Sequence, residues 1–93
     1  LGKTWIIMYK IRFVPKAIED LQRIDPIWQK RIKTKIELLR TNPDSLKNNI
    51  KPLKGKYKGL ARLRIGSYRV TFQVKRDKLI ILIIRIASRQ ENY

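Results

Sequence analysis

The sequence predicts a single α+β domain over residues 1–93, in which an antiparallel β-sheet carries a hairpin of two helices on one face. Three observations lead to this fold class. The length of 93 residues suffices for one domain. Apolar residues recur first at strand spacing, then at helical spacing, and then at strand spacing again. Short connections between the last strands indicate antiparallel pairing, so we expect the order β-α-α-β-β-β along the chain, with both helices on the same face.

The first half of the chain predicts one strand and two helices. Met8–Phe13 alternates its side chains with strand period. Pro15 begins the first helix, because a missing backbone N–H costs nothing at the first helical position. Asp25 caps the second helix and Pro26 takes its first position, and this helix ends before Pro43.

A loop and three strands complete the predicted order. Residues 45–59 have no sustained period and contain two glycines, which is typical of a loop. The strands are expected at Leu60–Ile65, Tyr68–Lys75 and Leu79–Ala87. Gly66-Ser67 separates the first two strands and predicts a type II′ hairpin, because glycine adopts the positive φ that this turn requires.

The hairpin registers place basic side chains on the face of the sheet that lies away from the helices. The Gly66-Ser67 turn puts Arg64 opposite Arg69. For the next hairpin we choose a three-residue turn at 76–78 over a two-residue turn, because that register keeps one face wholly apolar. It also places Arg85 beside Arg69.

The basic face predicted in this way points to an anionic ligand, because like charges directly opposite each other destabilise a sheet. Arginine binds phosphate in bidentate geometry, which indicates a nucleic-acid backbone. The simpler interpretation, in which basic residues only solvate the exposed side of the sheet, stays open. The expected face carries Arg62, Arg64, Arg69, Arg85 and Arg89.

Composition excludes several kinds of chemistry. The chain has no Cys and no His, and therefore no thiol nucleophile, no imidazole base and no Ser-His-Asp triad. Its 7 Asp and Glu residues are scattered, which argues against a metal site, and we expect no cofactor. The 23 Lys and Arg residues give a net charge of +16, which indicates a polyanionic partner.

Nothing in the sequence predicts a membrane segment. The longest apolar run, residues 79–84, is far shorter than the about twenty residues of a spanning helix. The apolar stretch before Met8 is too short for a signal-peptide core. We therefore expect a cytoplasmic protein without a membrane partner. Residues 1–7 precede the only Met and are interpreted as a vector-derived remnant or an upstream extension, although a native origin stays open.

Three motifs stand out in the second half of the chain. They are Leu53-Lys54-Gly55, the block Arg62-Leu63-Arg64-Ile65-Gly66-Ser67-Tyr68-Arg69, and Ser88-Arg89 followed by Tyr93. Together with the order of elements, they resemble the RelE/ParE superfamily of bacterial and archaeal toxins over residues 8–93. The resemblance implies a toxin that a cognate acidic antitoxin neutralises. In the RelE branch it implies a ribosome-dependent endoribonuclease that cuts mRNA in the A site, by attack of the ribose 2′-OH on the adjacent phosphate without a metal, and so inhibits translation.

The resemblance also implies roles for individual residues. The expected catalytic residues are Arg64, Arg69, which binds phosphate, Arg89, which assists the leaving oxygen, and Tyr93, which stacks on or orients a base. The expected RNA- or phosphate-binding residues are Lys54, Arg62 and, from the predicted register, Arg85. Ser88 stands where many relatives carry His, and a guanidinium group stays protonated, so the general base is unidentified.

Two other functions stay open at this point. Toxins of the ParE type share the block at 62–69 and poison DNA gyrase without acting as nucleases, so the block does not discriminate between the two branches. A non-catalytic basic RNA-binding protein, for example one associated with the ribosome, also fits the charge.

Overall fold

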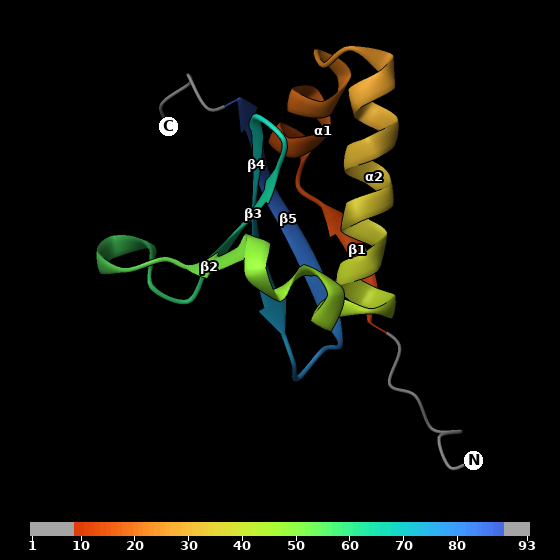
Figure 1. The fold of residues 1–93 in the computed structure, drawn as a ribbon. Coiled ribbons are helices and arrows are strands. Elements are labelled where there is room, and N and C mark those ends of the chain that lie inside the picture. The colour runs from red at the N-terminus through yellow and green to blue at the C-terminus, as the bar shows by residue number, and fades with distance from the viewer. Residues whose placement is uncertain (1–8, 89–93) are drawn as a thin grey trace, which may run out of the picture.

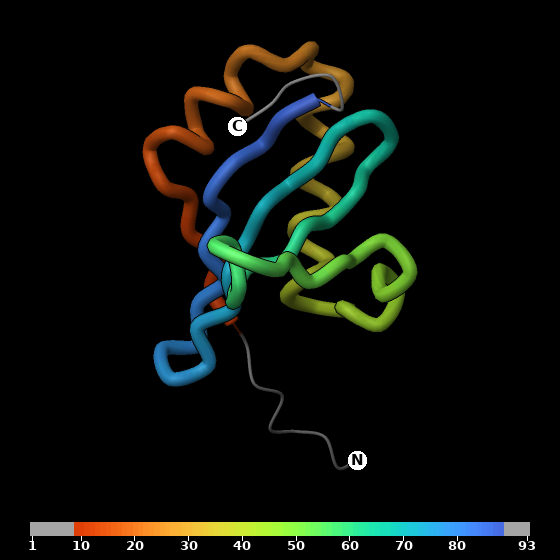
Figure 2. Tube along the Cα trace, turned by 90° about the vertical axis from the view of Figure 1, so that its left-hand side faces the viewer, coloured from red at the N-terminus to blue at the C-terminus, as the bar shows by residue number. Residues whose placement is uncertain are grey.

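The computed structural model describes residues 9–88 and has the predicted α+β architecture (Figure 1). Its elements are β1 (Lys10–Phe13), α1 (Pro15–Gln22), α2 (Pro26–Thr41), the 3₁₀ segment η1 (Pro43–Asn49), β2 (Ile50–Pro52), the 3₁₀ turn η2 (Gly55–Tyr57), β3 (Ala61–Ile65), β4 (Tyr68–Lys75) and β5 (Ile80–Ser88). The five-stranded sheet has the order β1-β5-β4-β3-β2, and α1 and α2 lie on one face of it. Figure 2 shows the other, open face with α2 behind the strands. The extension expected at residues 1–7 lies outside the described residues.

Both helices begin where the sequence predicts. Pro15 and Pro26 occupy first helical positions, and the Asp25 carboxylate accepts a hydrogen bond from the Ile27 N–H at 3.2 Å. The apolar sides of the helices pack against the sheet, which places the core between the two layers. The buried core residues are Ala17, Leu21, Ile32, Ile36, Leu39, Leu46, Leu63, Ile65, Val70, Phe72, Ile81, Ile83 and Ile86. No helix within residues 9–88 is long and apolar enough to cross a membrane.

The hairpin between β3 and β4 confirms the predicted register. Arg64 pairs directly with Arg69. Gly66 has a φ of +58°. Leu79 is the only non-glycine residue with a positive φ within residues 9–88. Ser67 therefore keeps the negative φ of the second turn position in a type II′ hairpin.

The same glycine lets α2 approach the hairpin closely. A Cβ atom added at Gly66 would lie 2.5 Å from Cη2 of Trp28, so a side chain there would displace the indole. The Trp28 ring in turn lies against Tyr68, with 5.5 Å between the ring centroids. Gly66 is thus required both by the turn and by the packing of α2.

The sheet is not wholly antiparallel, and this part of the prediction was wrong. β1 pairs with β5 in parallel, with Phe13 opposite Ile83. Short turns make β3, β4 and β5 alternate in direction, whereas β1 and β5 are joined only through the rest of the chain. The helices carry the chain from β1 to the far edge of the sheet, and the successive antiparallel strands then bring β5 back beside β1.

The edge strand β2 was missed. It pairs antiparallel with β3, with Ile50 opposite Leu63 and Lys51 opposite Arg62. Its three residues are too few to show a period, and they include Pro52. Proline is tolerated here because an edge strand does not need every N–H for the ladder. The order along the chain is therefore β-α-α-β-β-β-β.

The predicted turn between β4 and β5 was also wrong. Lys75 pairs with Ile80, so the turn spans the four residues 76–79 instead of three. Leu79 adopts a φ of +54° in this turn. That conformation favours glycine, so no local residue signal indicates a turn that ends on a leucine.

A bulge between Thr71 and Phe72 shifts the β4–β5 register once more. Beyond the bulge, Thr71 pairs with Arg85 and Arg69 pairs with Ala87. A bulge inserts one residue without any change in the surrounding apolar pattern, which is why periodicity did not reveal it. Arg85 consequently does not lie beside Arg69, as the predicted register required.

Candidate nucleic-acid interface

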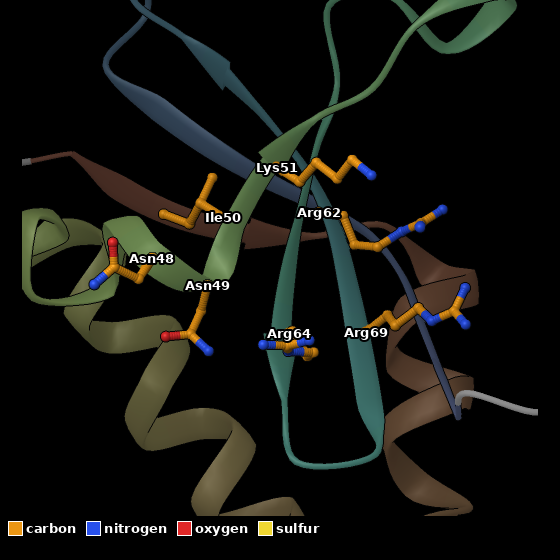
Figure 3. A pocket seen from close by; sticks show the side chains of 7 residues that line it. All are labelled: Asn48, Asn49, Ile50, Lys51, Arg62, Arg64 and Arg69. Atoms are coloured by element: carbon orange, nitrogen blue, oxygen red, sulfur yellow. The ribbon is translucent and has the colours of Figure 1, made fainter.

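A pocket on the open face of the sheet gathers cations from the neighbouring strands β2, β3 and β4 (Figure 3). Its basic residues on β3 alternate with the buried Leu63 and Ile65, which places them on the face away from the helices. The pocket has a volume of about 290 Å³, just below the range of about 300–1,000 Å³ for small-ligand sites. It is lined by Asn48, Asn49, Ile50, Lys51, Arg62, Arg64 and Arg69, and no carboxylate is among these residues.

Two like-charge pairs lie across the strands of this pocket. Arg64 on β3 faces Arg69 on β4. Lys51 on β2 faces Arg62 on β3, a pair that the sequence did not predict because β2 was missed. Like charges directly opposite each other destabilise a sheet. A bound anion would offset this repulsion.

Arg62 contains a donor atom that the fold leaves unsatisfied. Its Nε is buried and has no hydrogen-bond partner among the described residues. A buried donor without an acceptor costs about 1–3 kcal/mol, and such groups in native structures call for an explanation. An anionic oxygen bound in the pocket would supply the acceptor.

The structure brings together three of the predicted site residues. Arg62, Arg64 and Arg69 all line the pocket. Lys54 does not line it and is exposed, directly before η2, in the loop that projects from the open face (Figure 1). Arg89 and Tyr93 lie outside the described residues.

Arg85 is held by an ion pair with α1. Its Nε donates to Oδ2 of the buried Asp20 at 2.8 Å. The same oxygen accepts a hydrogen bond from the Ile86 N–H at 2.9 Å. Pairing between β1 and β5 stops at Phe13, so Asp20 supplies the acceptor that no strand provides on this edge of β5. The predicted position of Arg85 beside Arg69 was therefore wrong, and its contact with Asp20 accounts for where it lies.

Three polar lining residues were missed by sequence reasoning, namely Asn48, Asn49 and Lys51. They lie where η1 passes into β2, and this stretch has no period. The one usable signal is Ile50, which packs partly buried against the core. If Ile50 is paired with the core residue Leu63 of β3, the next residue, Lys51, falls on the opposite face of the sheet, beside the arginines.

Several of the described carboxylates form contacts within the scaffold. Glu37 pairs with Arg40 on α2, and Glu19 pairs with Lys16 on α1 at 3.6 Å. Within residues 9–88, no three side chains of metal-binding type gather into a group. The chemistry available in the pocket is therefore that of guanidinium, ammonium and amide groups, and the independence from metals and cofactors stays a prediction.

The sequence and the fold match known toxins. The family model described as ParE toxin of type II toxin-antitoxin system, parDE, matches residues 11–93. Toxin RelE3 of Methanocaldococcus jannaschii is 33% identical over 86 residues, which cover 90% of this chain and 94% of that one. The chain belongs to the ParE/RelE toxin family. A second chain of that organism, named RelE1, is 36% identical to this toxin over 86 residues, which cover 91% of it and 94% of the relative. The family predicted from the motifs is thereby confirmed.

Solved structures of RelE share the fold of this toxin. The archaeal RelE–RelB complex from Pyrococcus horikoshii OT3 matches it with a TM-score of 0.75 at 22% identity, covering 91% of this toxin and 99% of that chain. The RelB–RelE antitoxin–toxin complex from Methanococcus jannaschii matches with a TM-score of 0.66 at 32% identity, covering 85% and 91%. These matches confirm the α+β fold class.

Proposed function

We propose that this toxin is a metal-independent endoribonuclease that cuts mRNA in the ribosomal A site and so inhibits translation. One observation carries the proposal, namely the set of opposed cations in the pocket on the open face. Arg64 faces Arg69 there, beside the pair of Lys51 and Arg62, with no carboxylate in the lining. A phosphate group that gains negative charge in its transition state is the ligand best suited to such a site.

The proposed reaction is attack of a ribose 2′-oxygen on the adjacent phosphorus. The new bond from the 2′-oxygen to phosphorus forms as the bond to the 5′-oxygen breaks, the 2′-OH loses its proton, and the leaving 5′-oxygen gains one. Guanidinium groups stay protonated, so Arg62, Arg64 and Arg69 stabilise the charge on the phosphate and hold it in line instead of accepting the proton. By family resemblance, Arg89 assists the leaving oxygen and Tyr93 holds the base.

The partners that we propose are an acidic antitoxin and, in the cytoplasm, the ribosome with its mRNA. The solved relatives from Pyrococcus horikoshii and Methanococcus jannaschii are complexes of RelE with RelB. A net charge of +16 attracts either an acidic protein or RNA over a distance before specific contacts form. An antitoxin that covers the pocket would compete directly with RNA.

A second candidate function is poisoning of DNA gyrase. It is favoured by the ParE description of the family model that matches residues 11–93. A gyrase poison would not require the pocket to bind RNA, so the two candidates differ in what the pocket arginines do. Non-catalytic RNA binding is the third candidate. In that case the pocket cations would bind RNA, and the RNA would not be cut.

The decisive experiment adds the purified toxin to ribosomes that carry a defined mRNA and maps breaks by primer extension. We expect breaks within the A-site codon that disappear in Arg64→Ala and in Arg69→Ala. Arg76→Ala is the matched control, because Arg76 is an exposed cation in the β4–β5 turn and does not line the pocket. Supercoiling by gyrase is assayed in parallel.

The outcomes separate the three candidates. Loss of supercoiling without mRNA cleavage would replace the proposed function by the second candidate. The absence of both effects, with retained binding to RNA, would leave the third. Cleavage that survives Arg64→Ala and Arg69→Ala would remove the pocket from the mechanism.

A further inference from the structure

The pocket on the open face has two chemically different ends (Figure 3). The first, the amide end, consists of Asn48, Asn49 and Ile50. The second, the cationic end, consists of Lys51, Arg62 and Arg69. Arg64 lies between the two ends in the same view. A nucleotide has the same division, with a charged phosphate on one side and a neutral base on the other.

The cationic end suits a phosphate and cannot by itself select among nucleotides. Lysine and arginine side chains donate hydrogen bonds and accept none. Contacts of this kind with phosphate fix the position of a nucleic acid but carry no information about its sequence. Phosphate oxygens alone would neutralise the opposed cations and would accept a hydrogen bond from the buried Nε of Arg62.

The amide end has the groups that read a base. An Asn side chain donates and accepts hydrogen bonds in one plane, and adenine presents a matching donor and acceptor at N6 and N7. Unpaired RNA bases expose this edge to proteins. Asn48 and Asn49 are both exposed where they line this end of the pocket. Asn49 directly precedes β2 and lies between Asn48 and Arg64 in Figure 3.

We propose that the amide end reads the base of the nucleotide whose phosphate lies at the cationic end, and that Asn49 gives this site a preference for adenine. The inference rests on the proposed function, because it takes RNA to be the bound anion. It goes further in naming the group that makes binding depend on sequence. The arginines are then responsible for affinity and Asn49 for selectivity.

The test measures binding of the full chain to four fluorescently labelled RNA hexamers by anisotropy. Each hexamer contains five uridines and one internal test base, A, C, G or U, and carries 2′-O-methyl groups so that no attacking hydroxyl is present. We expect the adenine hexamer to bind roughly tenfold more tightly than the all-uridine hexamer, as for one bidentate base contact. Asn49→Ala is expected to remove this difference while the affinity for the all-uridine hexamer stays the same.

Two variants serve as controls. Asn42→Ala deletes a matched amide at the C-terminal end of α2, outside the pocket, and is expected to keep the adenine preference. Lys51→Ala deletes a cation and is expected to weaken binding of all four hexamers by the same factor. Thermal melting confirms that each variant is folded.

Several outcomes would overturn the inference. Equal binding of the four hexamers, or an adenine preference that survives Asn49→Ala, shows that the amide end does not read the base. A guanine preference that Arg64→Ala removes would make an arginine the reader instead. If none of the hexamers binds, the inference fails as well. In each case the proposed function is judged separately, by mRNA cleavage on ribosomes.

Discussion

The Asp20 carboxylate ties α1 to the edge of β5, and Asp20→Ala is expected to destabilise the fold strongly. The Asp20 side chain is only 8% exposed. It accepts hydrogen bonds from Nε of Arg85 at 2.8 Å, from Nη2 of Arg85 at 3.4 Å and from the Ile86 N–H at 2.9 Å. The substitution therefore removes the acceptor of two different groups at once.

The magnitude follows from these contacts. The Ile86 N–H lies in a residue that is 2% exposed, and a buried donor without an acceptor costs about 1–3 kcal/mol. A hydrogen bond to a charged group is worth about 1.5–3 kcal/mol. The Arg85 side chain is 28% exposed and retains a further contact, so water and that contact compensate part of this second loss. We expect a total loss of about 2–4 kcal/mol, which corresponds to a melting temperature lower by roughly 8–30 °C for a chain of this size.

Thermal denaturation followed by circular dichroism measures this loss, with two variants for comparison. Asp20→Asn keeps an oxygen that accepts from the Ile86 N–H and removes only the charge, so it is expected to cost about half as much as Asp20→Ala. Glu19→Ala is the matched control, because Glu19 is the adjacent carboxylate, is 56% exposed and forms a surface ion pair with Lys16. Such pairs are worth about 0–1 kcal/mol.

Two results would refute this reasoning. The first is a melting temperature of Asp20→Ala that is lowered no more than that of Glu19→Ala. This would show that water replaces the carboxylate without cost. A loss in Asp20→Asn equal to that in Asp20→Ala would place the whole effect in the charge and contradict the role assigned to the Ile86 N–H.

Three further perturbations test the pocket and the β4–β5 turn. Arg64→Gln removes a charge opposite Arg69, so we expect a melting temperature a few degrees higher together with loss of mRNA cleavage; a lower melting temperature contradicts the repulsion. For binding to single-stranded RNA, we expect the logarithm of the binding constant to fall with the logarithm of the salt concentration with a slope of about −2.8, from about −0.7 for each of the four pocket cations. Titrations at several salt concentrations are expected to give a slope of about −2.1 for Lys51→Ala. Leu79→Gly relieves the positive φ of 54° and is expected to stabilise by about 0.5–1 kcal/mol after the entropic cost of glycine, which a denaturant midpoint below that of the unmodified toxin would contradict.

The β3–β4 hairpin is the part of the site that was predictable to the residue pair. Its turn has two residues and begins with Gly66, which fixes Arg64 opposite Arg69 without reference to the rest of the chain. The starts of the helices at Pro15 and Asp25 rest on equally local causes. These features were predictable because the residues that determine them are close neighbours in the sequence.

The errors concern features whose causes are distant or lack a residue signal. The direction of β1 depends on the path of the whole chain. β2 is too short for periodicity and becomes recognisable only through its pairing, with Lys51 opposite Arg62. The β4–β5 turn uses a left-handed Leu79 where glycine is the usual signal. Amino-acid patterns therefore showed that a basic face exists but not all the residues that form it.

Arg69 and Arg85 show how a small change of register separates a pocket residue from a scaffold residue. Both are arginines in strands of the same hairpin, and the predicted register placed them side by side. The longer turn and the bulge beside Thr71 pair Arg69 with Ala87 instead, and Arg85 contacts Asp20 on α1. Composition cannot distinguish the two, because both contribute equally to the net charge. What distinguishes them is where the described carboxylates lie, since Arg85 has the buried Asp20 within hydrogen-bond distance, whereas no carboxylate is among the residues that line the pocket of Arg69.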